Sequence, residues 1–496
     1  MLVPPDATRP PEAEPAADAC PPAANPAAPS RSARLGRYDR SIVEGPVRKV
    51  VWRLAWPTIV QNALGGLQGV VDHAMVGNFV GFTGNAAIGV SWQIFLVVIV
   101  FMSSLFTGMA VLVARFAGAN EPDKVNKVVY QAFLVALVLA VGVLAPIGYF
   151  RAPYLLDLVN AASEVQREAL PYIRTLFVFG LGLLLFFMLS GALRAAGDVR
   201  TPMRFGLWIT GLNVVFNVIL IRGLGPIPAF GTKGAAIGTV LASGLASTVA
   251  LWMLLTDRLV VGFPRNSYAP DWAIIRSLFR FGLPAGVQGV AMNIAGLLLL
   301  RFIGSLEHSA AAQAAYAVGY TELFSLVSWT SVGLMGAASV AAGQNLGAGK
   351  PERSVQAVRA AAGAGLIIAA CVSTLFLLIP EQLVAVFGLT DPTVVAISRQ
   401  LLGYLAISAF FITVALTYTG GLQGTGDTRS PLYITLVSQI AVPLGICTVM
   451  EAMGDLQPSS IWTAIVLGHI TRCTLSVWRF RQRKWVQIAV DIGGRK

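Results

Sequence analysis

The stretch AAGDVRTPM at residues 195–203 has a near copy, GTGDTRSPL, at residues 424–432. Each copy places a glycine, an acid, a base and a proline between two long apolar runs. The two copies lie in opposite halves of a chain of 496 residues. A polar stretch written twice in this way indicates that the sequence consists of two related halves.

Two further pairs of segments support the duplication. AGANEPDK at 117–124 matches LGAGKPER at 346–353, and these two segments are separated by 229 residues, as are the two polar stretches. WPTIVQ at 56–61 resembles LPAGVQ at 283–288. All three pairs occur in the same order along the chain. The sequence therefore predicts two homologous halves, joined by a polar connection at 257–273.

The composition places these halves in a membrane. The mean hydropathy is +0.70, 55% of the residues are hydrophobic and only 12% are charged. Apolar runs of about 20 residues recur, which is the length that a helix needs to cross a bilayer. We therefore predict an all-α integral membrane protein with about twelve transmembrane helices in two six-helix bundles. The predicted helices lie near 50–76, 86–113, 126–149, 168–193, 203–222, 234–256, 274–302, 312–341, 356–379, 396–420, 431–451 and 459–478.

The basic residues predict the orientation in the membrane. Lysine and arginine cluster before the first helix, after the last helix and in alternate loops, whereas the opposite loops contain few of them. Because basic loops stay on the cytoplasmic side, we expect both termini in the cytoplasm and the protein in the cell inner or plasma membrane. The net charge of +12 is spread over these helix ends instead of forming one basic patch, so we expect no nucleic-acid partner.

These features divide the chain into five predicted segments. The beginning of the chain is rich in proline and alanine, lacks the apolar core of a secretory signal and is expected to be disordered. The segments are a cytoplasmic tail at 1–40, an N-terminal lobe at 48–256, the cytoplasmic connection at 257–273, a C-terminal lobe at 274–480 and a basic cytoplasmic tail at 481–496.

The repeated polar stretches are interpreted as structural turns at the cytoplasmic surface. In each copy the glycine and proline separate two helices, while the acid and the base can cap the helix ends. A catalytic or phosphate-binding role is the alternative. The residues concerned are Gly197, Asp198, Arg200 and Pro202 in the first copy and Gly426, Asp427, Arg429 and Pro431 in the second.

Two halves of six helices have the same orientation, which is the parallel type of transporter repeat. An inert duplicated bundle is the alternative. Together with RLAWPTIVQ at 53–61, VDHAMVG at 71–77 and the repeated G-D-x-R-[ST]-P loops, this organisation resembles the multidrug and toxic compound extrusion (MATE) transporters. The resemblance implies a V-shaped, two-lobed antiporter that alternates between inward-open and outward-open forms. Such a protein would export amphipathic, often cationic, compounds in exchange for a coupling ion.

Asp72 is the acid of greatest interest because an intramembrane carboxylate is costly and therefore a functional candidate. The alternative is a water-facing acid near the end of its helix. Pro57 precedes Asp72 by roughly 22 Å along the same predicted helix, which places Asp72 in the outer half. In the MATE family this helix bends, so Pro57 resembles a hinge, although a passive kink explains a proline equally well. His73 points to another side of the helix and is expected to pack against a neighbour, with a proton relay as the alternative.

Two amides accompany this acid. Asn213 and Asn217 are four residues apart in an apolar helix, so they share a face and need polar partners. Thr239 in the next helix is a natural partner. By resemblance to the MATE family, Asp72, Asn213, Asn217 and Thr239 correspond to a proton- or cation-coupling site of the N-terminal lobe. The alternative is a hydrogen-bonded cluster that only holds helices together.

The second half lacks this set. The positions equivalent to Asp72, Asn213 and Asn217 are apolar, namely Leu299, Val442 and Ile446. Some members of the family have an aspartate where this chain has Asn217, so one formal charge is present here instead of two. A single buried carboxyl group favours proton coupling, but amide and hydroxyl oxygens also suit sodium, and the coupling ion stays open between H⁺ and Na⁺.

We expect no cofactor, no metal site and no enzymatic activity. The four cysteines form no C-x-x-C pair, the three histidines are isolated, and no intramembrane cluster of acids or nucleophiles is evident. The expected partners are a small amphipathic substrate and the lipid bilayer, and the protein is expected to act as a monomer. The alternatives are a flippase or exporter of a lipid or specific metabolite within the same superfamily, or a membrane receptor or scaffold that transports nothing.

Overall fold

The computed structural model describes residues 38–159, 162–264 and 268–488, which are almost entirely helical. Most of the predicted tail at 1–40 and the end of the predicted tail at 481–496 lie outside these residues. The helices of the first half are α3 (Val47–Phe79), α4 (Phe82–Gly118), α5 (Pro122–Val138) continuing through η1 (Leu139–Leu144) into α6 (Ala145–Phe150), α8 (Ser163–Val178), α9 (Leu181–Ala195), α10 (Arg200–Arg222) and α11 (Thr232–Leu255).

The second half repeats this order. Its helices are α12 (Trp272–Gly304), α13 (Ser309–Tyr316) continuing through η2 (Ala317–Leu323) into α14 (Ser325–Gly347), α15 (Pro351–Leu378), α17 (Pro392–Gly424), α18 (Arg429–Thr435) continuing through η3 (Leu436–Ala441) into α19 (Val442–Ala452), and α20 (Pro458–Arg481). Short helices are α2 (Ser41–Glu44), α7 (Ala152–Leu158), α16 (Pro380–Ala385) and η4 (Lys484–Gln487). The last three follow the third, ninth and twelfth long helices.

Each of the twelve predicted helices coincides with a helix, or a helical series, of the structure. Within the described residues, nine helices are long and apolar enough to cross a membrane, and α8 with α9 forms a tenth span that bends by 50°. The remaining two, α3 with 33 residues and α20 with 24, are long enough but contain polar residues such as Asp72 and Arg472. One expectation needs correction, because the helix predicted at 168–193 is interrupted where Phe179 and Gly180 leave regular helical geometry.

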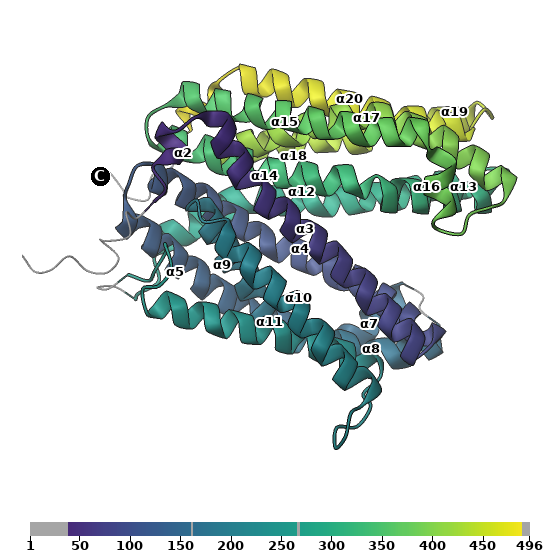
Figure 1. Cartoon of the computed structure of the whole chain (residues 1–496), viewed down its shortest axis with the longest axis horizontal. Coiled ribbons are helices and arrows are strands. Elements are labelled where there is room, and N and C mark those ends of the chain that lie inside the picture. The colour runs from purple at the N-terminus through teal and green to yellow at the C-terminus, as the bar shows by residue number, and fades with distance from the viewer. Residues whose placement is uncertain (1–37, 160–161, 265–267, 489–496) are drawn as a thin grey trace, which may run out of the picture.

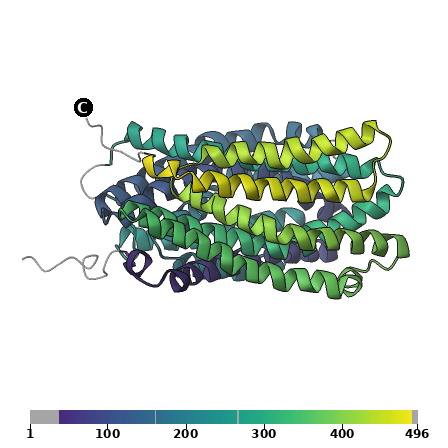
Figure 2. The same ribbon diagram turned by 90° about the horizontal axis from the view of Figure 1, so that it is seen from above.

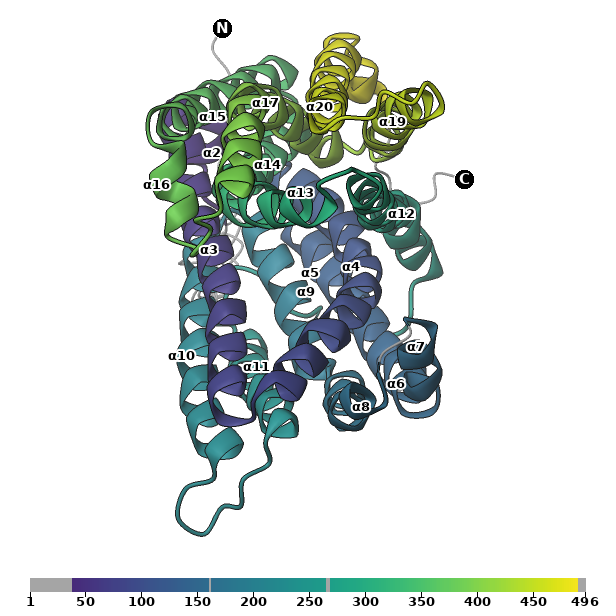
Figure 3. The ribbon, with the colours of Figure 1, turned by 90° about the vertical axis from the view of Figure 1, so that its right-hand side faces the viewer.

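The helices form two lobes that meet at one end of the molecule and diverge at the other (Figure 1). The end where they meet carries α2 and the described C-terminal residues, and we call it the terminal end. Viewed from above, the long helices run roughly parallel to one another along the molecule (Figure 2). The opposite end, seen in Figure 3, carries α7, α16 and the loop between α10 and α11.

Two helices pass from one lobe to the other. The first turns of α3, including Val50 and Leu54, belong to a hydrophobic cluster formed mainly with α14 and α15 of the second half. In the same way, Ile274 and Leu278 at the start of α12 pack in the core of the first lobe, whereas Leu299 near its end packs in the core of the second. The lobes are thus linked by an exchange of the first helix of each half.

Glycines allow the lobes to approach closely at the terminal end. A Cβ atom on Gly118 would lie 2.0 Å from the carbonyl oxygen of Gln344, and one on Gly347 would lie 2.1 Å from the carbonyl oxygen of Arg115. Gly118 and Gly347 belong to the repeated segments at 117–124 and 346–353. The duplicated motif therefore places α4 and α14 backbone to backbone, a contact that no larger residue permits.

The predicted inter-lobe connection is held against the first lobe. Its Gly262 amide donates to the Oδ1 atom of Asn126 over 2.8 Å. The amide group of Gln131 on α5 donates to the carbonyl oxygen of Ala269 over 2.9 Å and accepts from the backbone of Asp271 over 3.1 Å. These bonds set the point at which α12 begins.

Candidate functional site

The structure brings the four predicted coupling residues into one hydrogen-bonded chain. The hydroxyl of Thr239 on α11 accepts a bond from Nδ2 of Asn213 over 3.0 Å. Nδ2 of Asn217 on α10 then donates both to Oδ1 of Asn213 over 3.2 Å and to Oδ1 of Asp72 over 2.6 Å. The chain thus runs across three helices and ends on the carboxylate of α3.

The residues of this hydrogen-bonded chain are buried, so their polar groups need partners within the protein. The side chains of Asn213 and Asn217 are fully buried, and Thr239 is 8% exposed. Amide groups removed from water need hydrogen-bond partners, and their spacing of four residues aims both toward the same neighbours. Oδ1 of Asn217 nevertheless has no hydrogen-bond partner among the described residues. Among these four side chains, the carboxylate of Asp72 is the group that can take up a proton or pair with a cation.

The close contact between α10 and α11 depends on Gly238. A Cβ atom at this position would lie 2.2 Å from Oδ1 of Asn217. Gly238 precedes Thr239, so the same turn of α11 supplies both the space for one amide and the hydroxyl for the other. Sequence reasoning did not single out this glycine, although its position beside Thr239 was the available signal.

His73 contacts a different helix from its neighbour Asp72. Its Nδ1 atom lies 2.5 Å from Oδ1 of Asn85 on α4. No hydrogen bond between His73 and Asp72 is present in the described structure. The geometry matches the expected packing of His73 against a neighbouring helix.

Pro57 lies within the first half of α3, which remains helical on both sides of it. The helix contacts α14 beyond this point, since Nδ2 of Asn62 donates to the carbonyl oxygen of Trp329 over 3.4 Å. It also contacts α10, where the hydroxyl of Thr210 donates to Oε1 of Gln68 over 3.3 Å. Between Pro57 and Asp72, α3 is therefore placed between helices of both lobes, and hinge bending at Pro57 stays a prediction.

The second half has no copy of the coupling residues at the equivalent positions. Leu299 is 8% exposed and packs in the second hydrophobic core, where Ile446 also makes contact. Val442 lies at the start of α19. The two lobes therefore share a backbone arrangement but differ in the polarity of their interiors.

A cavity of about 290 Å³ lies between the lobes toward the terminal end. Residues of α3, α4, α9 and α14 line it, together with Gln423 of α17. Thr58, Asn62 and Gln423 provide polar groups, and Phe106, Phe187 and Met335 provide apolar surface. Arg194 is the one ionisable side chain among the lining residues that the structure describes.

The repeated polar loops have the same backbone. Gly197 and Gly426 have positive φ angles of 99° and 96°, which a residue with a side chain adopts only with strain. Oδ1 of Asp198 accepts from the backbone of Thr201 over 3.1 Å, and its Oδ2 accepts from the Thr201 hydroxyl over 2.6 Å. Asp427 makes the same pair of bonds with Ser430 at 3.2 and 2.8 Å.

The copies differ in one ion pair. Asp427 is 5% exposed and accepts from Arg479 of α20, with Nε at 2.9 Å and the terminal nitrogen at 2.8 Å. Asp198 has no ion pair with the described residues. Arg200, Pro202, Arg429 and Pro431 lie in the first turns of α10 and α18, where the helices begin after each loop.

Hydrogen bonds between the two halves join a side chain of each half to the region of the repeated loop in the other half. Arg115 at the end of α4 donates to the carbonyl oxygens of Thr425 over 3.2 Å and Ile488 over 3.0 Å. Gln344, which occupies the equivalent position of α14, donates to the carbonyl oxygen of Ala195 over 2.7 Å. We call these two residues and their acceptors the latch. Each half thus reaches the polar loop region of the other.

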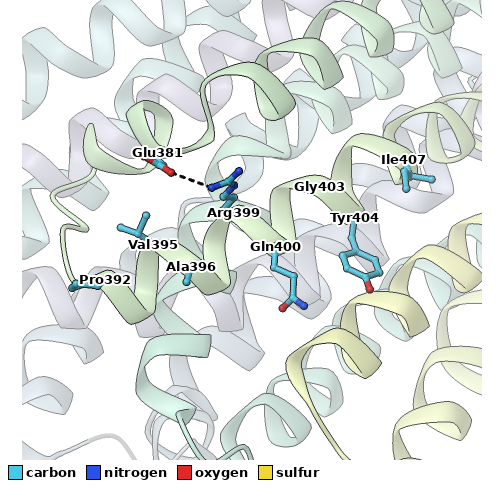
Figure 4. Close-up of a pocket in the computed structure, with 9 residues that line it drawn as sticks. All are labelled: Glu381, Pro392, Val395, Ala396, Arg399, Gln400, Gly403, Tyr404 and Ile407. Carbon is cyan, nitrogen blue, oxygen red and sulfur yellow. Dashed lines mark ion pairs between the residues drawn. The ribbon is translucent and has the colours of Figure 1, made fainter.

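A second cavity, of about 720 Å³, lies at α16 and α17 of the second lobe (Figure 4). Figure 4 shows Arg399 directed toward Glu381, with which it forms an ion pair at 3.5 Å. Gln400 and Tyr404 line the same cavity one helical turn apart. Both members of the ion pair are more than half exposed, so this groove is a solvated surface and not a buried ionic site.

Among the described residues, no three or more histidine, cysteine, aspartate or glutamate side chains are placed to hold a metal ion. The candidate site consists of the carboxylate of Asp72, the amides of Asn213 and Asn217, and the hydroxyl of Thr239. The residues of the latch were not predicted as functional, although Arg115 precedes one repeated segment and Gln344 precedes the other.

The fold and the site define an integral membrane protein of two homologous six-helix lobes with a hydrogen-bonded carboxylate in the first lobe. The MatE family model matches residues 57–219 and 284–447, one match in each half. The chain therefore belongs to the MatE family. The two matches begin at Pro57 and Pro284, in the first helix of each half.

Individual proteins are similar over most of the chain. It is 26% identical to the "Probable multidrug resistance protein NorM" of Thermotoga maritima, covering 90% of this chain and 94% of that protein. It is 27% identical to the "Multidrug resistance protein MdtK" of Pectobacterium atrosepticum, covering 86% and 94%. A solved structure described as the "Outward-facing conformation of a multidrug resistance MATE family transporter of the MOP superfamily" has a TM-score of 0.82 at 21% identity, covering 89% of this chain and 97% of that one.

Proposed function

We propose that this protein is a secondary active antiporter that exports amphipathic, cationic drugs or metabolites in exchange for protons or sodium ions. Membership of the MatE family and similarity to proteins named for multidrug resistance support a drug efflux transporter. The observation that carries the ion-coupled mechanism is the 2.6 Å hydrogen bond between Asp72 and the buried Asn217. It makes the state of one intramembrane carboxylate depend on the packing of α3 against α10.

The coupling step is a change in what the carboxylate of Asp72 binds. When ionised, it accepts the amide hydrogen of Asn217 and attracts a cation. When protonated, it loses that charge and becomes a hydrogen-bond donor. Sodium would instead be held by the carboxylate of Asp72, since hard cations prefer oxygen ligands. Either ion can move the lobes only by binding one arrangement more tightly than the other.

The proposed orientation places the terminal end in the cytoplasm of a cell with the protein in its inner or plasma membrane. Contact between the lobes at that end and their divergence at the other then correspond to an outward-facing form (Figure 1). Alternating access requires the latch formed by Arg115 and Gln344 to open. We further propose that one chain is sufficient for transport and that no cofactor takes part.

The test is efflux of a fluorescent lipophilic cation from proteoliposomes under an imposed pH gradient or an imposed sodium gradient. Wild type is expected to move the dye under one of these gradients. The Asp72→Asn variant keeps the size of the side chain but cannot exchange a proton or supply a charge, so it should lose gradient-driven efflux. Asp123→Asn is the matched control, since Asp123 is exposed in the first turn of α5.

Full efflux by Asp72→Asn would overturn the coupling role of this residue. A second candidate function, export of anionic amphipaths or lipids, is favoured by Arg194 as the ionisable residue lining the inter-lobe cavity. The same vesicles loaded with a fluorescent lipophilic anion distinguish the two. Movement of the anion but not the cation would replace the cationic substrate class and leave the ion-coupled mechanism intact.

A further inference from the structure

The last long helix, α20, contains four buried polar side chains with atoms that lack hydrogen-bond partners among the described residues. The unpartnered atoms are Nε1 of Trp462, Nδ1 of His469, Nε of Arg472 and Oγ of Ser476. None of the four side chains is more than 4% exposed. Their spacing of seven, three and four residues places them along one face of the helix. The proposed coupling site in the first lobe uses none of them.

Burial of Arg472 costs more free energy than burial of the other members of this stripe, because Arg472 is charged. Its guanidinium group carries five N–H donors and a permanent positive charge. No described residue forms an ion pair or a hydrogen bond with it. It lies about 14 Å along the helix from the end of α20 and therefore within the membrane span. A buried charge without a partner costs several kcal/mol, so a compensating negative charge is expected nearby.

An aromatic ladder positions the stripe. The ring of Trp462 stacks on Tyr316 with centroids 6.3 Å apart, and Tyr316 stacks on Tyr320 at 4.9 Å. Tyr320 stacks on Phe324 at 5.5 Å, and Phe324 stacks on His469 at 6.0 Å. The ladder thus begins and ends on α20 and fixes that helix against α13 and η2.

The ladder supplies no carboxylate to the guanidinium of Arg472. Tyr320 and His469 are the ladder residues that interact electrostatically with Arg472. A tyrosine hydroxyl is neutral and can share a hydrogen bond but cannot balance the charge. The stripe therefore combines one fixed positive charge with N–H and O–H groups.

The two lobes differ in the sign of the buried charge that each carries at these sites. The position equivalent to Arg472 in the first lobe is Ser243, and the position equivalent to Asp72 in the second lobe is Leu299. The first lobe therefore presents a carboxylate with amides, whereas the second presents a guanidinium with indole and hydroxyl donors. A site of the first kind suits cations, and one of the second kind suits anions.

We propose that Arg472, together with His469 and Ser476 on the neighbouring turns of the stripe, binds a monovalent anion inside the second lobe. The anion accepts hydrogen bonds from the guanidinium of Arg472 and from the nearby N–H and O–H groups, and its charge offsets the buried positive charge. Two kinds of ligand carry such a charge, namely a free halide such as chloride and the carboxylate group of a small organic molecule. The site is separate from the coupling residues and does not depend on the proposed cation exchange.

The experiment measures the apparent melting temperature of the purified full-length protein in detergent at constant ionic strength. Chloride or acetate replaces gluconate stepwise as the anion of the buffer. A ligand that binds only the folded state raises the melting temperature with the logarithm of its concentration once that concentration exceeds the Kd. We expect such a rise with at least one of the two small anions. A response to chloride assigns a halide site, and a response to acetate alone assigns a carboxylate site.

The variants identify the place of binding. Arg472→Met removes the charge while keeping a long, flexible side chain, and it should abolish the anion response. Ser476→Ala removes one hydroxyl donor one helical turn from Arg472, so it should weaken anion binding about fivefold. Arg399→Gln is the matched control, because Arg399 is an exposed guanidinium of the same lobe that pairs with Glu381.

The outcomes are decisive even if Arg472→Met fails to fold, since Ser476→Ala tests the same site with a smaller change. Wild-type melting that does not depend on chloride or acetate would overturn the proposal. An unchanged anion response in Ser476→Ala and Arg472→Met would also contradict it. A purely structural Arg472 would alter stability equally in all buffers.

Discussion

At the residue scale, Asn217 connects the intramembrane acid to the rest of the first lobe. Its Nδ2 atom bonds both Asp72 and Asn213, while its Oδ1 atom faces the space that Gly238 leaves open. Sequence spacing predicts that Asn213 and Asn217 share a face, and resemblance predicts their association with Asp72 and Thr239. The structure brings all four together, and their part in ion coupling stays a prediction.

Replacing Asn217 by leucine should therefore affect stability and transport together. The variant keeps the volume but leaves the carboxylate of Asp72 and the carbonyl oxygen of Asn213 without their donor. Loss of a partner to buried polar groups costs about 1–3 kcal/mol. We expect a lower melting temperature and slower gradient-driven efflux from proteoliposomes.

The control for this variant is Asn78→Ala near the end of α3. Asn78 is exposed, and its side chain bonds only the carbonyl oxygen of Ala74 in its own helix. This change should leave both measurements close to wild type. Asn217→Leu with wild-type stability and wild-type efflux would show that the hydrogen-bonded chain is dispensable.

At the scale of elements, the repeated loops show one backbone design in two settings. Both begin with a glycine of positive φ and hold the first turn of the next helix through an aspartate. The geometry is that of a capped turn between two helices. Only the second copy adds Arg479, which joins the loop to the end of α20.

This difference predicts unequal effects of the same substitution. Asp198→Asn should cost little, because asparagine caps the start of a helix about as well as aspartate does. Asp427→Asn should cost more, because it also leaves Arg479, whose side chain is 25% exposed, without its carboxylate; the loss should fall below the roughly 3–5 kcal/mol of a fully buried ion pair. Thermal unfolding of the two variants in one detergent measures the difference.

The double variant Asp427→Asn with Arg479→Gln serves as the control for the ion pair. Removing the unpaired charge should recover part of the stability that Asp427→Asn loses. Equal destabilisation by Asp198→Asn and Asp427→Asn would mean that the ion pair adds nothing to the turn.

At the scale of the whole molecule, the duplicated halves meet through a pseudo-symmetric contact. Gly118 and Gly347 bring the backbones of α4 and α14 together, and the latch residues Arg115 and Gln344 reach the opposite lobe beside them. Buried charge-assisted and amide bonds favour this closed arrangement of the terminal end. Any opening at that end must break both sets of contacts.

Weakening the latch should shift the protein toward an open terminal end. We expect Arg115→Gln combined with Gln344→Leu to lengthen the distance between spin labels at positions 200 and 429. These are equivalent exposed positions of the two lobes at that end. Double electron–electron resonance in a background without native cysteines measures the distance distribution.

Arg276→Gln is the control for this measurement, since Arg276 is exposed near the start of α12 and no hydrogen bond or ion pair with the described residues involves it. It should leave the distribution unchanged. A latch variant with the wild-type distribution would indicate that the glycine contacts and apolar packing alone hold the lobes together at this end.

The sequence by itself determined the membrane class, the number and position of the helices, the duplication and the polar residues of the candidate site. These features follow from local hydropathy and from spacing along one helix, because the bilayer requires each span to satisfy its own backbone. The bend between α8 and α9 escaped this reasoning, since apolar composition is the same on both sides of a break.

Only the tertiary structure decided which helices meet. Hydropathy gives no preference among apolar neighbours in lipid, so the exchange of α3 and α12 between lobes depends on where small residues permit close packing. The latch likewise joins residues far apart in the chain, and the stripe on α20 is buried against α13 and η2. Their burial and missing partners become visible only when the helices that surround them are in place.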